Sequence, residues 1–409
     1  MKNLLKNGLI IIVITILLII VIEISFKFLV WNNFSPYNTN LSIQGKSRWI
    51  NDSTLHWTNR PFFLEYNLSQ QYNEEGIRVL PKDVYMPKKN KNDFWVFLFG
   101  GSAMAGMGSN KDGKWYDITG VNDHLKDKSI DGYLEKILQE QMPKKNVRVF
   151  NAAVSMHGIY QSFNRYKLLK HYNPDWIVSM DGVNEPDQLD SNKTTDQYLK
   201  ELWKTNPTQN KPLTNTFFFM SNSALYYKLG KYKYYYLYDR KMKNKHDSLN
   251  INRNFWFNVQ SKPISYKIED VGLLQTAIKT FQANLAMFEE YLIDSKQNHL
   301  LLIQPFLAFR DTNKLDTIER GVYNYFTINH NLPNKNKFLT TIYKKANNNH
   351  KQVYTMQDVH SWKEWVFVDY CHFTSVANRK IANEIGKYIL SKGEYKPFKK
   401  NVDTLTNKH

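Results

Sequence analysis

Three residues that could together carry out acyl transfer lie far apart in this sequence. Ser102 follows the pair Gly100-Gly101, and Asp369 precedes His372 by three residues. A serine hydroxyl can attack an acyl carbonyl when a histidine accepts its proton and a carboxylate orients that histidine. The pattern therefore predicts a nucleophile, a base and an orienting acid, provided that the fold brings position 102 close to positions 369–372.

Further groups could bind the negative charge that develops on the carbonyl oxygen. The sequence offers the amide of Asn184 and the backbone N–H groups around Ser102, where small neighbours leave the main chain uncovered. Each position also has a simpler structural interpretation. Asn184 could cap a following helix, Asp369 and His372 could cap the last helix, and Cys371 could be a small buried filler.

The elements that must position these residues are visible as short apolar segments alternating with helical patterns. Strands are expected over 94–99, 147–150, 174–180, 299–304 and 353–354, and helices over 130–142, 160–171, 266–295, 335–348 and 374–391. This alternation predicts an α/β fold with a parallel sheet. The carboxyl ends of parallel strands share one edge, so Ser102, the 151–158 turn, Asn184 and His372 are expected to lie there, with Ser102 at the start of a helix.

The motifs and their order resemble the SGNH/GDSL hydrolase superfamily. Gly100-Gly101-Ser102 resembles its first block, Gly182-Val183-Asn184-Glu185 its third, and Asp369-Tyr370-Cys371-His372 its fifth. The segments 73–78, 304–305 and 369–382 look like an envelope-associated bacterial branch of it. The resemblance implies a three-layer α/β/α sandwich with a short parallel sheet, catalysis through Ser102, Asp369 and His372, and no cofactor or metal.

The second block departs from the family pattern. Alignment of Asn151 and Gln161 with that block places Met156 where the family has the glycine that donates to the oxyanion, and Gly158 lies two residues later. Either backbone could supply the donor, beside Ser102 and Asn184. His157 and Glu185 border the site and are expected either to help bind the substrate or to be solvated loop residues.

The amino terminus predicts the location of the protein. Lys2 and Lys6 precede an apolar run from Gly8 that continues, through Glu23 and Lys27, to Trp31. Such a segment can cross a bilayer, with the lysines in the cytoplasm and the rest of the chain outside. No small-residue cleavage site follows it, so a signal anchor is favoured over a cleaved signal peptide.

The 409 residues are expected to divide into an anchor (1–31), a lead-in that packs on the main domain (32–92), a hydrolase-like domain (93–392) and a basic tail (393–409). The formal net charge is +18, and an insertion at 187–262 is rich in Tyr and Lys. It is expected to be a helical excursion, a lid, or a surface for anionic polymer or lipid headgroups. No nucleic-acid-binding motif is present, and the single cysteine excludes an intrachain disulfide.

Together these features predict a membrane-anchored serine esterase or O-acyltransferase acting on cell-envelope carbohydrate, with acetyl as the expected acyl group. Hydrolysis and transfer share one acyl-serine species, so the sequence does not separate them. The main alternative is a non-catalytic assembly or polysaccharide-binding protein that keeps the fold. A lipid-directed lipase is a weaker one, because no apolar acyl groove is evident.

Overall fold

The computed structural model describes most of the chain from Lys2 to Lys392. The described residues are 2–31, 40–41, 49–64, 72–79, 85–109, 122–123, 126–187, 196–197, 199–200, 271–315, 319–320, 323, 337–342, 344 and 353–392. The chain divides into two compact units. One contains Met1–Asn51, Trp57–Pro87 and Thr205–Asn252, and the other contains Asp52–His56, Lys88–Lys204 and Arg253–His409.

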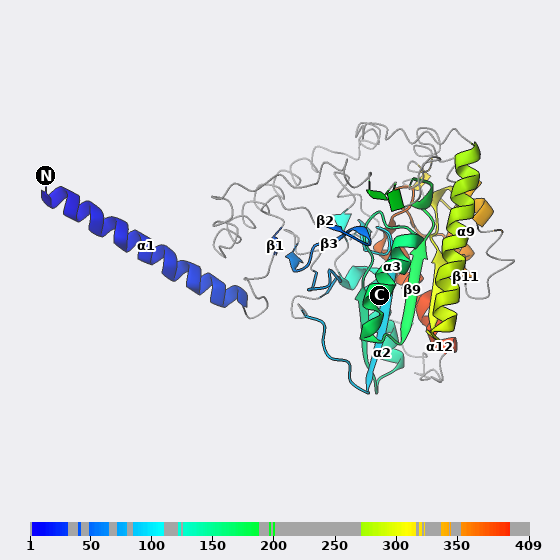
Figure 1. Ribbon diagram of the computed structural model, residues 1–409, viewed down its shortest axis with the longest axis horizontal. Coiled ribbons are helices and arrows are strands. Elements are labelled where there is room, and N and C mark those ends of the chain that lie inside the picture. The colour runs from blue at the N-terminus through cyan, green and yellow to red at the C-terminus, as the bar shows by residue number, and fades with distance from the viewer. Residues whose placement is uncertain are drawn as a thin grey trace, which may run out of the picture. The chain divides into compact units, whose positions relative to one another are not determined.

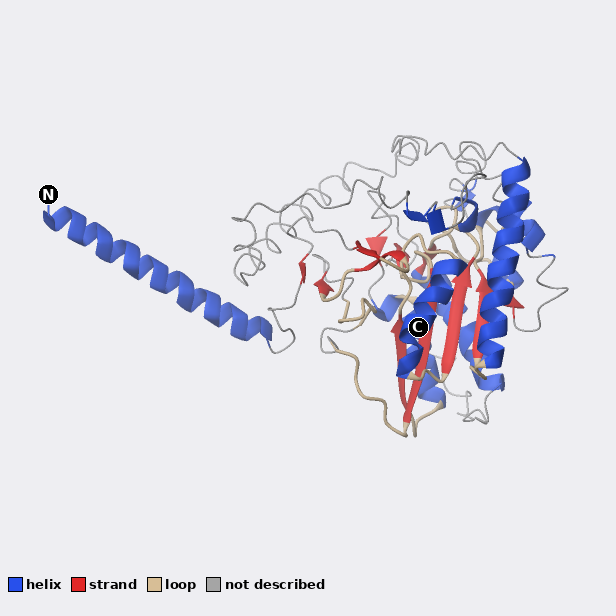
Figure 2. Ribbon diagram, viewed as in Figure 1, coloured by secondary structure: helices blue, strands red, loops and turns tan. Residues whose placement is uncertain are grey.

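The second unit is built on a five-stranded sheet whose pairs are all parallel (Figures 1 and 2). Its strands are β5 (Asp93–Gly100), β8 (Asn146–Asn151), β9 (Trp176–Asp181), β10 (His299–Ile303) and β11 (Val353–Tyr354). Their spatial order is β11-β10-β9-β5-β8. The chain therefore runs from β5 to one neighbour, β8, and then crosses back to β9 on the other side. The predicted α/β fold and its five strands are confirmed.

Four of the described helices pack on the sheet or on one another. They are α2 (Ile130–Gln141), α3 (Ile159–Leu169), α9 (Val271–Asp294) and α12 (Ser375–Lys392). Helix α2 packs against α12, and α3 packs against α9. Gly386 marks the close approach of the first pair, because a Cβ there would lie 3.1 Å from Cγ2 of Ile137.

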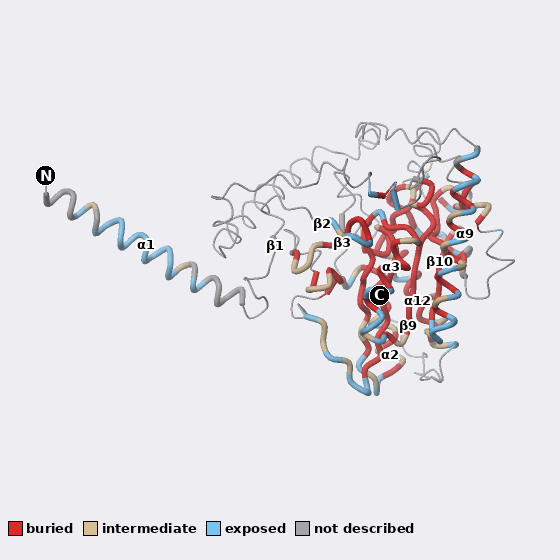
Figure 3. Tube along the Cα trace, in the orientation of Figure 1, coloured by how far each residue is buried: buried red, intermediate tan, exposed pale blue. Residues whose placement is uncertain are grey.

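The core lies between the sheet and these helices (Figure 3). All eight residues of β5 are buried, and its aromatic side chains pack together: the ring of Phe97 lies 5.1 Å from that of Phe150 on β8. On α12 the residues spaced by four, Ala377, Ile381, Ile385 and Ile389, are all buried, as their apolar period predicts. The resulting scaffold holds the carboxyl ends of β5, β8 and β9 at one edge.

A second, smaller sheet contains strands that lie close in the sequence to Ser102 and His372. Strand β6 (Met107–Ser109) begins five residues after Ser102, and β12 (Phe373–Thr374) directly follows His372. The two strands pair in parallel, with Phe373 opposite Gly108, and β7 (Asn122–Asp123) pairs with β6 on its other side. This sheet was not predicted, because each strand has only two or three residues.

One local expectation is wrong: no helix begins at Ser102. Residues 102–106 form a turn, in which the N–H of Met107 donates to the carbonyl oxygen of Ser102 at 2.9 Å. Gly106 has φ +91° and directs the chain into β6 instead of a second helical turn.

The first unit contains short elements and the amino-terminal helix. Strands β1 (Asn40–Leu41) and β4 (Phe63–Leu64) pair in parallel. Strand β2 (Trp49–Asp52) pairs with β3 (His56–Asn59), and the residues at their adjoining ends, Asp52 and His56, are counted with the second unit. A turn lies at Asn73–Arg78: Oδ1 of Asn73 accepts the N–H of Ile77 at 3.0 Å, and Gly76 has φ +65°.

Helix α1 spans Lys2–Trp31 and exposes large apolar side chains between Ile10 and Ile24. Among the residues that the structure describes, no helix meets the combined length and apolarity of a membrane span. The expected anchor is therefore not supported there. Most of the 187–262 insertion and the whole 393–409 tail lie outside the described residues, and the predicted domain boundaries stay predictions.

Candidate active site

Ser102 lies just beyond the carboxyl end of β5, at the point where the order of the strands reverses. In doubly wound sheets this is where ligands bind, because neighbouring crossovers leave the sheet in opposite directions and open a crevice. Gly100 has φ +141°, and a Cβ there would lie only 2.4 Å from the carbonyl oxygen of Met180 on β9. The glycine thus lets the nucleophile's turn lie close against the neighbouring strand.

The end of β8 also holds this turn. Nδ2 of Asn151 donates to the carbonyl oxygen of Met104 at 2.8 Å, and Oδ1 of Asn151 accepts the N–H of Ala153. Both ends of the Asn151 side-chain amide therefore form hydrogen bonds within the protein. Asn151 fixes the backbone around Ser102 from the neighbouring strand.

Asp369 and His372 form a tight turn in which one carboxylate makes three hydrogen bonds. Oδ1 of Asp369 accepts the N–H groups of Cys371 and His372 at 2.9 and 2.8 Å, and Oδ2 lies 2.6 Å from Nδ1 of His372. The backbone bonds fix the carboxylate, and the carboxylate fixes the imidazole. The Nδ1–H tautomer leaves Nε2 as an acceptor.

That Nε2 atom lies 2.7 Å from Oγ of Ser102. The contact joins residues 270 positions apart. It follows from the pairing of β6 with β12, because Ser102 precedes one strand closely and His372 directly precedes the other. The structure thus places Ser102, His372 and Asp369 in one line of hydrogen bonds, which is the arrangement that activates a serine hydroxyl.

Burial and charge have opposite effects on the pKa values of Asp369 and His372. Burial raises the pKa of Asp369, but the charge of His372 and the hydrogen bonds to the carboxylate outweigh it and leave that pKa below its ordinary value. Burial lowers the pKa of His372, while the charge of Asp369, its hydrogen bond and the neighbouring Cys371 raise it well above its ordinary value. The site is therefore built to stabilise the imidazolium that forms when Ser102 loses its proton.

Cys371 lies beside the imidazole and does not enter this line. Its Sγ is 3.6 Å from Nδ1 and 4.0 Å from Nε2 of His372, and the thiol is buried. Asp369, Cys371 and His372 offer three potential metal-binding atoms within 4.8 Å of one another. The carboxylate of Asp369 and the imidazole of His372 instead contact each other at 2.6 Å, as expected for a carboxylate that orients the base.

Asn184 approaches the nucleophile from the end of β9. Its Nδ2 donates to the carbonyl oxygen of His157 at 2.8 Å, and a Cβ on Gly101 would lie 2.5 Å from the same Nδ2. The amide therefore packs directly on the residue before Ser102. An amide carries two N–H bonds, so one can hold the turn at His157 while the other binds an oxyanion.

The turn between β8 and α3 supplies the two open candidates for a further donor. The N–H of Gly158 donates to Oε1 of Gln161 at 3.2 Å, which commits it to the first turn of α3. Met156 has φ +66°, a conformation that glycine adopts without cost, and its residue is 43% exposed. The bond at Gly158 argues against that donor, and the choice of Met156 stays a prediction.

His157 and Glu185 border the site as expected, but their side chains are buried, with 2% and 7% of their surface exposed. Oε1 of Glu185 accepts the N–H of Ile159 at 2.7 Å. Their positions therefore suit holding the turn more than contacting a substrate. The expectation that they bind the substrate is not supported by this burial.

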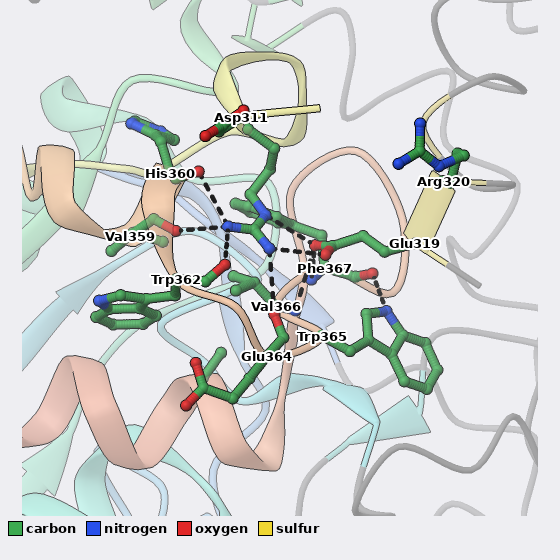
Figure 4. Close-up of polar contacts among 12 residues, drawn as sticks. Asp311, Glu319, Arg320, Val359, His360, Trp362, Glu364, Trp365, Val366 and Phe367 are labelled. Carbon is green, nitrogen blue, oxygen red and sulfur yellow. Dashed lines mark hydrogen bonds and ion pairs between the residues drawn. The ribbon is translucent and has the colours of Figure 1, made fainter. Parts of the chain in front are cut away.

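A buried ion pair that was not predicted from the sequence holds the loop leading to Asp369. Arg310 and Glu319 form a bidentate pair, with Nη2 to Oε2 at 2.9 Å and Nε to Oε1 at 3.1 Å, and both side chains are fully buried (Figure 4). The guanidinium also donates to four carbonyl oxygens of the preceding loop, those of Val359, His360, Trp362 and Glu364.

Glu319 holds the part of the same loop that lies closer to Asp369. Its Oε1 accepts the N–H groups of Val366 and Phe367 at 3.2 and 3.0 Å. Farther along the loop, the N–H of Leu307 donates to the carbonyl oxygen of Tyr370, and Nε2 of Gln304 donates to that of Cys371. The end of β10 and the segment after it thus fix the backbone on both sides of Asp369.

No family model matches the chain, and no curated protein matches it. Solved structures that resemble it include a lipase/acylhydrolase from Enterococcus faecalis, at 12% identity and a TM-score of 0.37, with 75% of this chain and 100% of that chain covered. An acetylxylan esterase from Geobacillus stearothermophilus has 10% identity and a TM-score of 0.35, covering 73% and 96%. An aryl esterase from M. smegmatis has 14% identity and a TM-score of 0.33, covering 73% and 99%. At such identities and scores the likeness is remote, and the case for function rests on the contacts of Ser102 and His372.

Proposed function

We propose that this chain is a serine esterase or O-acyltransferase that works through an acyl-Ser102 intermediate. The observation that carries the proposal is the 2.7 Å contact between Oγ of Ser102 and Nε2 of His372, continued by the 2.6 Å contact between Nδ1 and Asp369. A hydroxyl with no catalytic task has no need of a buried imidazole that is itself oriented by a buried carboxylate.

The reaction follows from these contacts. Oγ of Ser102 attacks the ester carbonyl carbon while Nε2 of His372 takes the hydroxyl proton, and the Asn184 amide stabilises the oxyanion. The tetrahedral species collapses when the imidazolium returns that proton to the leaving alkoxide, so the carbon–oxygen bond breaks and acyl-Ser102 remains. A second hydroxyl, from water or from a sugar, then reacts by the same steps in reverse order and frees Ser102.

Hydrolysis of p-nitrophenyl acetate by the full-length protein tests this mechanism. Ser102→Ala and His372→Ala should each lower kcat by about 10⁴-fold or more. Ser295→Ala is a suitable control, because Ser295 is exposed just after α9 and its hydroxyl bonds to the carbonyl oxygens of Tyr291 and Leu292 and to the side chain of Tyr166, none of which is a proposed catalytic residue. Wild-type turnover no faster than that of Ser102→Ala would contradict simple esterase chemistry.

A fluorophosphonate probe separates catalysis from the non-catalytic alternative. Labelling that disappears in Ser102→Ala identifies an activated serine, whether the acyl acceptor is water or a sugar. An unlabelled wild-type protein would favour a polysaccharide-binding or assembly role. With labelling established, products from an O-acetylated oligosaccharide, incubated with and without a second sugar, show whether the acetyl group is released or transferred.

We further propose that residues 1–31 anchor the protein in a membrane, with the site on the outer side and cell-envelope carbohydrate as its substrate. The support is the apolar run from Gly8 to Ile22, preceded by Lys2 and Lys6 and followed at the far end by Trp31. Retention in the membrane fraction after alkaline carbonate extraction is the expected result. Release of the intact chain would contradict the anchor, and a shortened mature chain would favour a cleaved signal peptide.

A further inference from the structure

Glu185 connects the two segments that line the proposed oxyanion site. It follows Asn184 directly, and its Oε1 accepts the N–H of Ile159, the first residue of α3, at 2.7 Å. In the opposite direction, Nδ2 of Asn184 donates to the carbonyl oxygen of His157 at 2.8 Å. These two bonds join residues 184–185 to residues 157–159, which adjoin Met156. Their lengths therefore set the distance between the Asn184 amide and the Met156 turn.

A second buried carboxyl group ties the same helix to the end of β9. Oδ1 of Asp181 accepts the hydroxyl of Ser162 on α3 at 2.9 Å, and Oδ2 accepts the hydroxyl of Ser179. The two acids thus hold the first turn of α3 at two points, Ile159 and Ser162. A helix start held twice cannot shift along the sheet without breaking one of these bonds.

We propose that Glu185 is a positioning residue that keeps Asn184 and the turn at Met156 in the geometry for oxyanion binding. The inference rests on the proposed esterase function and adds a residue whose effect is exerted through Asn184. It also assigns a role to a side chain that is too buried to be a direct substrate contact.

The proton on Glu185 is part of this arrangement. Burial raises the pKa of Glu185 to about 8, and the charge of Asp181 adds to this rise. Burial likewise raises the pKa of Asp181 to about 6, against the hydrogen bonds from Ser179 and Ser162. At neutral pH Glu185 is therefore the protonated member of the pair.

The groups that face Glu185 explain why its ionisation would disturb the site. From α3 it meets the N–H of Ile159, and from the end of β9 it meets the N–H of Gly182 and its own N–H. These donors favour the ionised carboxylate, but burial and the charge of Asp181 outweigh them. The charge that acts on it is that of Asp181, which is of the same sign. An ionised Glu185 would therefore be a buried and repelled charge beside a developing oxyanion, and both effects oppose the reaction.

The pH dependence of kcat/KM for p-nitrophenyl acetate, measured with the full-length protein and corrected for spontaneous hydrolysis, tests the inference. The wild-type value should rise with pH as His372 becomes neutral and then fall as pH rises through about 8. Glu185→Gln keeps the acceptor for Ile159 but cannot ionise, so its profile should lose this alkaline fall. Glu185→Ala removes the link and should lower kcat by about 10-fold or more with little change in KM, since one oxyanion donor is worth about 10²-fold.

Asp181→Asn is a more discriminating variant, because it should move the alkaline fall of kcat/KM to lower pH, whereas Glu185→Gln should abolish that fall. Loss of the Asp181 charge lowers the pKa of Glu185, so the alkaline fall should move to lower pH. A merely structural role would weaken both variants without moving the fall in opposite directions. A Glu185→Gln profile that still falls as in the wild type, or an Asp181→Asn fall at higher pH, would overturn the inference.

Thermal stability provides a readout that does not depend on turnover. The folded pKa of Glu185 is raised, so its contribution to stability is complete below the unfolded value near 4.5 and is lost as pH rises to about 8. The melting temperature of Glu185→Gln, relative to that of the wild type, should therefore be higher at pH 8 than at pH 5. A constant difference would overturn the protonated arrangement. Absence of wild-type turnover alone would instead refute the esterase proposal.

Discussion

Replacement of Arg310 by methionine tests how the loop that carries Asp369 and His372 is held. The change removes the two hydrogen bonds to Glu319 and the donors to four loop carbonyl oxygens, and it leaves the Glu319 carboxylate buried without its cation. The methionine side chain has a similar length and fills much of the same space, so the loss is mainly electrostatic.

The magnitude follows from the full burial of both side chains. Removal of one partner of a buried ion pair costs about 3–5 kcal/mol, whereas replacement of both partners by apolar residues is often nearly neutral. A domain has about 5–15 kcal/mol in total, so the single variant should lose a large part of its stability. In the Arg310→Met/Glu319→Leu double variant the part of that loss caused by the unpaired carboxylate should be regained. The four loop carbonyl oxygens still lack their donor there, and the N–H groups of Val366 and Phe367 lose their acceptor.

The pH dependence gives the prediction its sign. Burial raises the pKa of Glu319 even though Arg310 lowers it. Without Arg310 that pKa should rise further, so folding would force the proton back onto the carboxyl over a wider pH range. A raised folded pKa gives stability that is complete below the unfolded value near 4.5 and is lost as pH rises. The loss in Arg310→Met should therefore be larger at pH 8 than at pH 5.

Urea unfolding followed by tryptophan fluorescence at pH 5 and pH 8 measures these differences for the wild type, both single variants and the double variant. The reasoning would be refuted by a loss below about 1 kcal/mol in Arg310→Met, which is typical of an exposed pair. It would also be refuted by equal losses at the two pH values, or by a double variant less stable than Arg310→Met.

Four further predictions concern the site itself. Asp369→Asn should lower kcat by about 10³- to 10⁴-fold, since the imidazole loses its orienting acceptor; steady-state kinetics with p-nitrophenyl acetate checks this. Gly101→Ala should lower kcat by about 10²-fold, because its Cβ would lie 2.5 Å from Nδ2 of Asn184 and displace the amide; a change confined to KM would contradict it. Met156→Gly should raise stability by about 1 kcal/mol by relieving the positive φ of 66°, measured as a higher melting temperature. The acylation rate should fall as pH drops through the raised pKa of His372, because only the neutral imidazole accepts a proton; a pH profile flat down to pH 6 would contradict this.

The strands and the reacting residues could be predicted because both leave local signals in the sequence. The fully buried strand β5 is a run of apolar residues that ends in two glycines, and parallel strands bring their carboxyl ends to one edge whatever the details of the loops. Ser102, Asn184 and His372 could therefore be assigned to one site from their places after strands or before the last helix.

The features that escaped prediction depend on contacts without a local signal. Arg310 and Glu319 are single charged residues in a segment without periodicity, and only the fold shows that both are buried and paired. Glu185 was expected to meet the substrate because it follows Asn184, yet its carboxyl group turns inward to Ile159. The helix expected after Ser102 ends as a single turn because Gly106 takes a positive φ. Glycine permits this conformation, but its presence in the sequence does not predict it.

The simpler interpretation of Asp369 and His372, as caps of the last helix, can be decided from where that helix begins. Helix α12 starts at Ser375, and the N–H of Ala377 donates to Oγ1 of Thr374, so Thr374 occupies the capping position. Asp369 lies five residues earlier and uses its oxygens on the turn at 371–372 and on the imidazole. The helix needs neither side chain for its first turn. Their mutual contact and the contact with Ser102 therefore require another explanation, and proton transfer at the serine is the one that uses every bond in the turn.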